Sequence, residues 1–532
     1  RSPTVCEFEG RRTRMRVAAR LLLLVLPYAA AGRTTIFSRK VLLPDSTIVP
    51  AAVTVDGSTI TAVVRCDAPP AGCERLVDLG DQLLTPAFIN AHTHLPMAAL
   101  RGVEGCAKAM GGDVVKDLFF KVERLMTPDD VRAFTRMGAY ESLLCGVGLV
   151  YEHYYHGRAI ADALSDTGLA GVVAPTLQDL SGPGVPWLEQ ALLDTAEIAD
   201  DERLRKCGIF AALGPHATDT VSDALWLRII AQAHASGGLP VHAHLGQGVG
   251  EFHAALTRGG AVDNEAAGLT PMRLLEKLGV LDAGLPLALV HAQYATEADL
   301  LLLRRTRHML ITCPFSHVLF SFPSPVAQWL AAGAEIACGT DAAASNDCMN
   351  VQKELRLLSA GYAPFAATHS SEMQMLWSAP ATSSASELAA LADGVFAVRQ
   401  RTHETPSATR LRKPSELLKT VWQTPGRLHP HFVAGAIKEG ALANFLAFDL
   451  THPNLWPAAD IMAALVMCDA SPAIHSMMVA GKWIGREPDA SHAPAPDFRR
   501  ALLDSDAYMA ARTEADARLA ALLERAGIRL AI

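Results

Sequence analysis

Residues 83–102, LLTPAFINAHTHLPMAALRG, contain the pattern that is most informative about the fold of this chain. The apolar first half of this stretch is typical of a buried strand, and it ends abruptly at His92 and His94. Residues two apart on a strand point to the same face, so the two imidazoles can share one metal ion. A His-x-His pair is weak evidence by itself, because surface histidines at this spacing commonly bind nothing.

Three later segments repeat this arrangement, in which an apolar strand-like run ends in a residue able to bind a metal. They are residues 239–244, ending at His244; residues 287–291, ending at His291; and residues 335–341, ending at Asp341. Helical stretches between them favour a parallel sheet, and in a (β/α)8 barrel all strands end at one face. Residues far apart in the chain can therefore converge on a site that suits Zn²⁺ or Fe²⁺.

These segments resemble the amidohydrolase superfamily, in particular its branch of cytosine deaminase, S-adenosylhomocysteine deaminase and the triazine chlorohydrolases. The resemblance covers residues 34–490. It is carried by PAFINAHTHLPMAALRG (86–102), YEHYYH (151–156), GPHATDTVS (214–222), VHAHLGQ (241–247), LVHAQY (289–294), TCPFSH (312–317) and GTDAAASNDCMN (339–350).

The resemblance implies one divalent metal ion, with Zn²⁺ as the first expectation and Fe²⁺ as the alternative. The ligands implied by this match are His92, His94, His244 and Asp341. His291 is implied to hold the metal-bound water or the substrate. Strand alternation puts His242 on the same face as His244, so geometry alone does not choose between them. The family motif places the ligand at His244, and we expect His242 to pack or to form a hydrogen bond inside the barrel.

The expected chemistry follows from this site. A metal ion in it would lower the pKa of a bound water to about 7 and generate hydroxide at neutral pH. Asp341 can take the water proton as a general base, and His291 can stabilise charge on the attacked group. The alternative for Asp341 is an ordinary turn aspartate after Gly339 and Thr340, but residues 344–347 also match the family motif.

Gln247 departs from the deaminase pattern. The deaminase branch usually has a glutamate here, which carries a proton to the substrate's ring nitrogen and then to the leaving ammonia. Glutamine cannot titrate, and a general acid or base contributes about 10²–10⁴ in rate. Either ordinary deamination is disabled, or the proton transfer moves to Asp341 or His291, with Glu251 as a less favoured substitute. The Gln247 amide can still bind the edge of a heterocycle by two hydrogen bonds.

Two further residues are candidates for substrate contact by the same match. Glu123, at the end of FFKVE, corresponds to an acidic residue that lies over the pocket in relatives handling nucleosides. His216, in GPHATDT, corresponds to a strand-end histidine that contacts the substrate. Each has a structural alternative, because a glutamate on a helix is usually solvated and a strand-end histidine can serve packing alone.

The sequence therefore supports three hypotheses of function. The first is a metal-dependent hydrolase that deaminates an N-heterocyclic substrate such as a purine, pterin, pyrimidine or nucleoside-like molecule. The second is a triazine-type or cyclic-amide hydrolase, whose leaving group needs less protonation, so that Gln247 is less damaging. The third is a catalytically weakened subunit for ligand binding or assembly. Motifs of other enzyme classes, such as His-Glu-x-x-His, Gly-x-Ser-x-Gly and the phosphate-binding loop, do not occur.

Composition agrees with a large enzyme that binds a small molecule. The chain has 532 residues, half of them hydrophobic, which is enough for a large core. The net charge of −8 argues against a nucleic-acid partner. Ten cysteines form no Cys-x-x-Cys pair, so reduced thiols are favoured over a disulfide scaffold or zinc ribbon. We expect a heterocyclic substrate and a homo-oligomer.

The order of strand and helix patterns predicts an α/β chain with distinct regions. Short β-branched runs occur in residues 34–87 and again in 434–490, and in the family the two ends of the chain build one β-sandwich. Residues 88–433 are expected to form the (β/α)8 barrel. Residues 491–532 have helical spacing and form a covering helix or an oligomer contact. Residues 378–412 fit no tight barrel loop and indicate an insertion.

Residues 1–33 form an N-terminal extension of ambiguous meaning. The segment RVAARLLLLVLPYAAAG at 16–32 has the outline of a secretory signal, with basic residues before an apolar core and small residues after it. It is too short to span a membrane. Met15 lies inside the chain, so the extension could also be upstream sequence. We expect a cytoplasmic protein without a membrane span, with export as the alternative.

Overall fold

The computed structural model describes residues 32–488 and 498–527, except 103–114, 259–268, 304–307, 347, four positions within 321–325 and most of 369–412. Residues 1–31 and most of the predicted insertion at 378–412 therefore lie outside the described residues. Strands alternate with helices through most of the described chain, and the strands between residues 88 and 342 pair in parallel. The predicted α/β class is confirmed.

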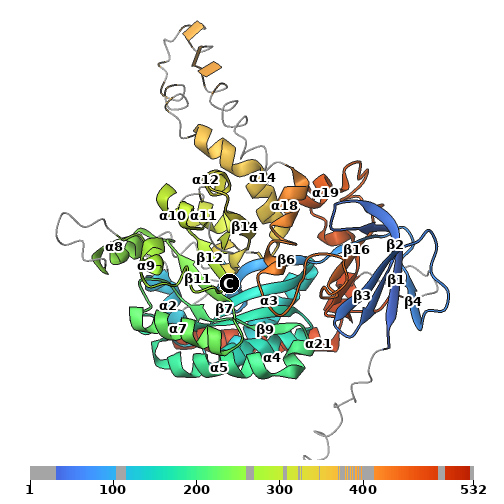
Figure 1. Cartoon of the computed structure of the whole chain (residues 1–532), viewed down its shortest axis with the longest axis horizontal. Helices are drawn as coiled ribbons and strands as arrows, with labels where there is room; N and C mark the ends of the chain where they lie inside the picture. The colour runs from blue at the N-terminus through green and yellow to red at the C-terminus, as the bar shows by residue number, and fades with distance from the viewer. Residues whose placement is uncertain are drawn as a thin grey trace, which may run out of the picture.

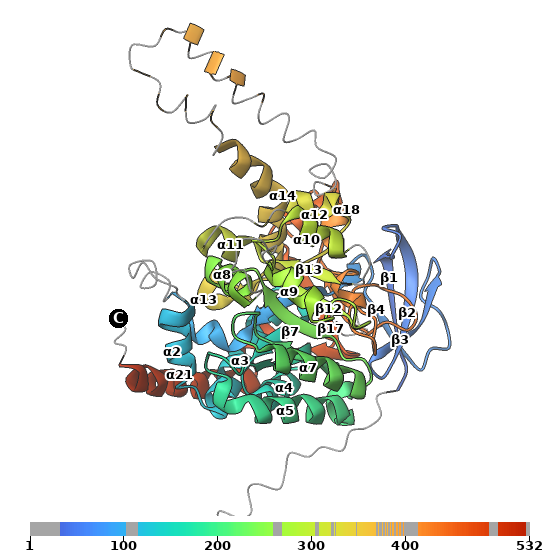
Figure 2. The same cartoon turned by 60° about the vertical axis from the view of Figure 1, so that its left-hand side comes forward.

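Both ends of the chain contribute strands to one eight-stranded sheet, seen at the right of Figures 1 and 2. Its strands are β1 (Thr34–Leu42), β2 (Ile48–Asp56), β3 (Thr59–Arg65), β4 (Arg75–Asp78), β5 (Leu83–Pro86), β16 (Phe445–Phe448), β17 (Ile474–Val479) and β18 (Lys482–Ile484). The two halves meet where β5 pairs with β16, with Leu84 opposite Ala447. Alternating apolar residues such as Ile36, Val53 and Phe445 fill a core of their own beside this sheet.

The remaining strands form two parallel sheets. The first has the order β10-β8-β7-β6-β15, with β9 beside β8, and the second has the order β11-β12-β13-β14. Their bounds are β6 (Phe88–His94), β7 (Val147–Tyr154), β8 (Ala170–Leu177), β9 (Ile209–Ala211), β10 (Gly214–Pro215), β11 (Val241–Leu245), β12 (Leu287–His291), β13 (Met309–Thr312), β14 (Glu335–Cys338) and β15 (Asp341–Ala342). These strands are buried almost throughout, as parallel strands covered by helices must be.

Backbone contacts link the two parallel sheets at both edges. On one side, Leu213, between β9 and β10, forms a parallel bridge with Val241 of β11. On the other side, the chain leaves β14 and continues into β15, where Asp341 is paired with Thr93 of β6. The carboxyl ends of strands from both sheets therefore meet at one place, where the predicted site residues lie.

Helices cover the parallel strands on two sides, which Figures 1 and 2 show above and below the strands. One group comprises α3 (Pro128–Leu144), α4 (Gly157–Thr167), α5 (Leu188–Asp200) and α7 (Asp223–Ala235), and the other comprises α10 (Glu297–Leu302), α11 (Pro314–Phe320), α12 (Val326–Ala331) and α14 (Val351–Thr368). Pro128 begins α3 after Thr127, whose side chain forms a capping box with Asp130. The order of helices and strands is that of repeated β/α units.

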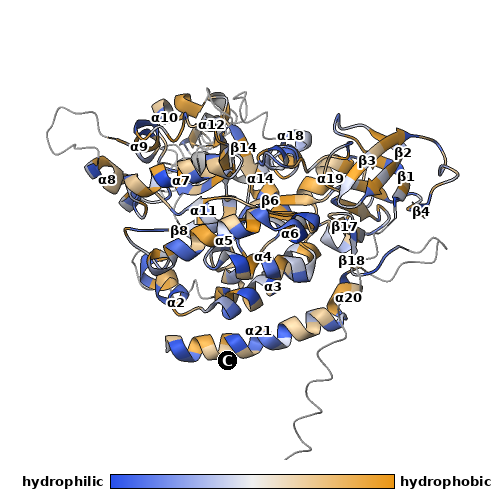
Figure 3. Cartoon of the chain, turned by 60° about the horizontal axis from the view of Figure 1, so that its bottom comes forward, coloured by the Kyte–Doolittle hydropathy of each residue, from blue (hydrophilic) through white to orange (hydrophobic). Residues whose placement is uncertain are grey.

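The predicted C-terminal helical region consists of α20 (Phe498–Leu503) and α21 (Asp506–Ala526) in the described chain. Figure 3 shows α21 below the other elements, with hydrophilic and hydrophobic residues interspersed along it. The helix packs on α3 through the ring of Tyr508, which lies edge-on to Tyr140. Arg518 and Arg525 form ion pairs with the buried Asp130. Among the residues that the structure describes, no helix combines the length and apolar character that crossing a membrane requires.

Candidate active site

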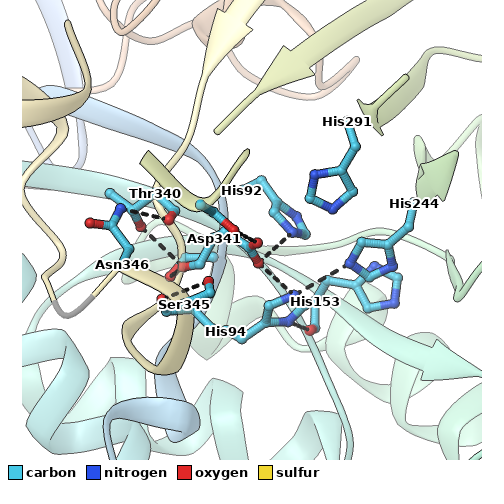
Figure 4. Close-up of polar contacts among 12 residues, drawn as sticks. His92, His94, His153, His244, His291, Thr340, Asp341, Ser345 and Asn346 are labelled. Atoms are coloured by element: carbon cyan, nitrogen blue, oxygen red, sulfur yellow. Dashed lines mark hydrogen bonds and ion pairs between the residues drawn. The ribbon is translucent and has the colours of Figure 1, made fainter. Parts of the chain in front are cut away.

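The four predicted metal ligands lie together at the ends of three strands (Figure 4). His92 and His94 end β6, His244 lies near the end of β11, and Asp341 begins β15. Nε2 of His94 lies 3.3 Å from Nε2 of His244 and 3.4 Å from Oδ1 of Asp341. Nε2 of His92 lies 3.6 Å from the same oxygen. Three imidazole nitrogens and one carboxylate oxygen thus face one another.

Backbone carbonyl groups orient two of these imidazoles. Nδ1 of His94 donates to the carbonyl oxygen of His153, and Nδ1 of His244 donates to that of His216 over 2.9 Å. A carbonyl can only accept, so the proton of each neutral ring lies on Nδ1. The lone pair on Nε2 of both rings is then directed at the cluster, as metal binding by histidine requires.

His92 is oriented by His242 instead of by a carbonyl. Nδ1 of His92 lies 2.9 Å from Nε2 of His242, and both rings are buried. Nε2 of His92, on the opposite side of the ring, is buried without a hydrogen-bond partner. Geometry therefore separates the two histidines of β11: His244 faces the cluster directly, while His242 lies behind His92.

Asp341 is held in an unusual backbone conformation, with a φ of 62°. A non-glycine residue pays for this conformation, so it persists only where the surroundings enforce it. Oδ2 of Asp341 accepts a hydrogen bond of 2.7 Å from the Ser316 hydroxyl, which leaves Oδ1 for the histidines. Burial alone would raise the pKa of Asp341, but the imidazoles of His92 and His94 outweigh it and hold this pKa well below its usual value.

The arrangement fits a divalent metal ion. Tetrahedral zinc with bonds of about 2.0–2.1 Å places neighbouring ligand atoms about 3.3 Å apart, and the separations here are 3.3, 3.4 and 3.6 Å. The bare Nε2 of His92 is a second indication, because a buried polar atom without a partner is costly. Nitrogen and carboxylate donors are also those that zinc prefers.

His291 lies beside this cluster at the end of β12. Its ring is stacked on that of His244, with centroids 5.4 Å apart, and its φ is 78°. Its Nδ1 lies 2.9 Å from Nε2 of His317, and its own Nε2 is buried without a hydrogen-bond partner. One ligand atom each of His92, His291 and Asp341 lies within 4.8 Å of the other two. The structure thus places His291 next to the predicted metal ligands.

Gln247 follows β11 in the loop before α8 (Val249–Arg258). Its backbone NH donates to Oε2 of Glu251 over 3.1 Å, and Oε1 of Glu251 accepts from the hydroxyl of Thr218 over 2.7 Å. Burial raises the pKa of Glu251 to about 7. Both carboxyl oxygens of Glu251 are therefore occupied in fixing the loop that carries Gln247, which disfavours Glu251 as a replacement proton carrier.

The two predicted substrate residues, Glu123 and His216, both lie near histidines of the cluster. Glu123 ends α2 (Phe120–Glu123) and is buried, which raises its pKa to about 7. A charge on His94 would lower the pKa of Glu123, so the carboxyl group is close enough to the cluster to interact with it electrostatically. His216 lies 4.9 Å from His244 between ring centroids, and its Nδ1 is 3.0 Å from the Thr220 hydroxyl. Glu123 is therefore not the solvated side chain of its structural alternative.

His153 lies in the YEHYYH motif but was not predicted as a site residue. This histidine is the penultimate residue of β7, and its ring centroid lies 4.8 Å from that of His244 (Figure 4). Both of its ring nitrogens are buried without hydrogen-bond partners. The neighbouring Glu152 accepts a hydrogen bond from the NH of Leu95, and burial raises its pKa to about 8. His153 could have been identified from the sequence, because residues 147–154 form another strand-like run with a ligand-type residue near its end.

The chain belongs to the amidohydrolase family, whose model matches residues 83–396. The family predicted from the motifs is confirmed, and with it the prediction of an enzyme of the hydrolase class.

Three similar proteins illustrate the range of the family. A 5-methylthioadenosine/S-adenosylhomocysteine deaminase of Moorella thermoacetica is 26% identical over 454 residues, which are 83% of this chain and 93% of the relative. A crystal structure of a zinc-bound adenosine deaminase from Xanthomonas campestris aligns with a TM-score of 0.67 and 22% identity over 91% of this chain and 98% of its own. An atrazine chlorohydrolase of Arthrobacter aurescens with zinc aligns with a TM-score of 0.67 and 18% identity over 91% of this chain and 100% of its own. At these identities the two structures establish the shared fold.

Proposed function

We propose that this protein is a zinc-dependent hydrolase that deaminates an N-heterocyclic substrate at a ring carbon. The observation that carries the proposal is the cluster of His92, His94, His244 and Asp341, whose donor atoms have the separations of a tetrahedral zinc site. Relatives named as deaminases of adenosine-type nucleosides support the reaction and the substrate class. We assign one metal ion to the site, with Fe²⁺ as the alternative to Zn²⁺.

The residues around the cluster have separate tasks in this proposal. Zinc, when bound, supplies the Lewis acid that makes a water nucleophilic at neutral pH. Asp341 is kept ionised by its neighbours, so its carboxylate can accept the proton that the water loses. His291 presents its unpartnered Nε2 to the same place. Both groups are buried, which excludes bulk solvent and strengthens their electrostatic effect.

Glu123 and His216 are proposed to contact the substrate from the rim of the site. Burial raises the pKa of Glu123 to about 7, so near neutral pH its carboxyl group can exist in either protonation state. It can accept hydrogen bonds from hydroxyl groups when ionised and donate one when protonated. His216 stands edge-on to Phe120, at 5.6 Å between ring centroids, and the two rings offer an aromatic surface for a heterocycle.

The second candidate function is hydrolysis of a triazine or a cyclic amide. Gln247 favours it, because the amide cannot deliver a proton to a leaving ammonia, whereas chloride leaves without one. The likeness to an atrazine chlorohydrolase is compatible with this candidate. If deamination is the reaction, the Gln247 amide binds the ring edge, and proton delivery falls to Asp341 or His291.

The experiment that separates these functions measures ammonia and chloride release by the zinc-reconstituted protein across purines, pterins, pyrimidines and triazines. Ammonia release confined to one ring type supports the deaminase, and chloride release supports the triazine hydrolase. A protein that retains one zinc ion per chain and turns over no substrate would instead be a binding subunit. The Asp341→Asn variant is the control for activity from contaminating enzymes.

The Gln247→Glu variant tests the role of this position directly. Where proton delivery limits deamination, glutamate should raise ammonia release, with about 10²-fold as the lower end of a general acid's effect. If the variant releases ammonia no faster than the wild type from any substrate that the wild type accepts, then Gln247 does not limit proton delivery and this account of its role is wrong.

We further propose three features of the whole chain. The bridges at Leu213–Val241 and Asp341–Thr93 support closure of the two parallel sheets into one barrel over residues 88–433. This barrel has eight strands when β9 and β10 count as one interrupted strand and β14 and β15 as another. The strands of residues 34–87 and 434–490 would form a β-sandwich beside it. The enzyme would act as a homo-oligomer in the cytoplasm, which light scattering after size-exclusion chromatography and cell fractionation can test.

A further inference from the structure

A chain of hydrogen bonds runs from Ser324 through His317 to His291. Oγ of Ser324 lies 2.7 Å from Nδ1 of His317, whose Nε2 lies 2.9 Å from Nδ1 of His291. The same Oγ lies 3.1 Å from the carbonyl oxygen of His291. All three residues are buried, so no solvent competes for these contacts.

The single hydroxyl proton of Ser324 sets the polarity of this chain. A carbonyl oxygen can only accept, so the contact between Oγ and the His291 carbonyl requires the hydroxyl to donate to it. The hydroxyl has no second proton, so towards His317 it is an acceptor. Nδ1 of His317 must therefore carry the proton of that hydrogen bond.

The polarity continues to His291. Burial lowers the pKa of His317 to about 4, so at neutral pH its ring has one proton, on Nδ1. Nε2 of His317 is then an acceptor, and Nδ1 of His291 must be the donor. A neutral His291 consequently has no proton on Nε2, the atom that lies unpartnered beside the metal-ligand cluster.

We propose that Ser324 and His317 are positioning residues that fix His291 in its Nδ1-protonated form and so present Nε2 to the reacting groups as a hydrogen-bond acceptor. The identity of the group that Nε2 of His291 would bind rests on the proposed hydrolytic function. This acceptor fits a group that bears hydrogen, such as the O–H of the attacking water or the N–H of an amino group on the substrate. The opposite tautomer would present a donor and would stabilise an anion instead.

The backbone of His291 gives independent geometric support. His291 and the following Ala292 have φ values of 78° and 40°, which non-glycine residues rarely adopt. The Ser324 hydroxyl binds the carbonyl group inside this strained turn, and His317 binds the side chain. These two contacts hold both the backbone and the side chain of His291, as expected where the orientation of a ring nitrogen matters for function.

The test is ¹⁵N nuclear magnetic resonance of the zinc-loaded full chain with labelled histidine, because the shifts of the two ring nitrogens report which one carries the proton. The His291 signals are assigned by their absence in His291→Asn. In the wild type at pH 7, Nδ1 of His291 should be protonated and Nε2 bare. Ser324→Ala should yield a mixture of both tautomers, while Ser324→Thr, which retains the hydroxyl, should restore the wild-type pattern. A wild-type His291 protonated on Nε2 would overturn the proposal whatever the substrate is.

Kinetics on any substrate found active provide the second readout. Ser324→Ala should lower kcat about tenfold, as expected for one buried hydrogen bond, with KM and zinc content unchanged, and Ser324→Thr should recover most of kcat. Ser142→Ala is the matched control, since this buried hydroxyl also donates to a carbonyl, that of Gly138, within α3. Equal losses of kcat in the threonine and alanine variants would contradict the relay. The relay would also be contradicted if the wild type bound a second zinc ion and His317→Gln lost it. His291, Cys313 and His317 would then be metal ligands.

Discussion

Nε2 of His94 lies 3.3 Å from Nε2 of His244, although 150 residues separate the two histidines in the sequence. Each ring is turned towards the other by a carbonyl group that accepts from its Nδ1. Two unprotonated nitrogens at this distance repel each other through their lone pairs unless a cation or a proton lies between them. The contact therefore indicates a positive charge between the two rings, which a bound metal ion would supply.

Replacing the two histidines of β11 separately should distinguish a ligand from its support. His244→Asn removes a donor atom and should abolish retention of zinc after dialysis. His242→Asn removes the group that orients His92, and such partners typically contribute about 10–100-fold to metal affinity. We expect this smaller loss for His242, measured by competition with a chromophoric chelator. The reverse order of effects would move the ligand to His242.

Gly339 lies so close to His92 that a side chain at position 339 would displace this proposed metal ligand. A Cβ atom at this position would lie 2.6 Å from the backbone nitrogen of His92 and 2.7 Å from its carbonyl oxygen. Gly339→Ala should therefore lower zinc affinity and the melting temperature together. Gly250→Ala is the matched control, because a Cβ there would meet nothing within 4 Å. Unchanged zinc binding in Gly339→Ala would show that His92 can move without losing the metal.

Glu354 should make stability fall as the pH rises. Burial raises its pKa to about 8 from an ordinary value of 4.5, although it accepts hydrogen bonds from Asn346 and from the NH of Phe315. A raised pKa means that the folded state favours the protonated form. The contribution to stability is complete below pH 4.5 and is lost as the pH rises towards 8.

The comparison with Glu354→Gln isolates this effect, because glutamine does not titrate. Urea unfolding of both proteins between pH 5 and 9 should show the wild type losing stability relative to the variant as the pH increases. A difference that stays constant with pH would mean that Glu354 has the same pKa in the folded and unfolded states.

Asp130 joins the C-terminal helix α21 to α3. Its carboxylate caps α3 with Thr127 and pairs with Arg518 and Arg525, 388 and 395 residues away. Asp130→Ala removes the capping interaction and leaves two arginines with weakened pairing, so we expect a loss of about 2–4 kcal/mol in the free energy of unfolding. Asp504→Ala, at an exposed pair with Arg500, should change it by less than about 0.5 kcal/mol.

The sequence predicted the α/β class and the meeting of the site residues because both depend on local patterns. Apolar runs that end in His94, His244, His291 and Asp341 identify strands and their ends, and parallel strands bring those ends together. It could not separate His242 from His244 without the family motif, because both lie on one strand face. The hydrogen bond from the His244 ring to the carbonyl of His216 depends on ring rotation, which strand periodicity does not specify.

The contacts of Ser324 could not be predicted from the sequence for a different reason. They depend on partners that the three-dimensional path of the chain brings close, such as the carbonyl of His291. No periodic pattern in the sequence indicates which serine determines the ring nitrogen that carries the proton in two histidines. Glu251 shows the converse, since a carboxyl group close to Gln247 in sequence proves to be occupied in holding its loop.

Anomalous diffraction at the zinc edge, recorded from crystals of the zinc-loaded protein, would show directly where the metal ion is bound. We predict one strong peak per chain within about 2.0–2.2 Å of Nε2 of His92, His94 and His244 and of Oδ1 of Asp341. A fully occupied zinc peak elsewhere in the chain, or no peak among these four atoms at saturating zinc, would contradict the assignment of this cluster as the metal centre.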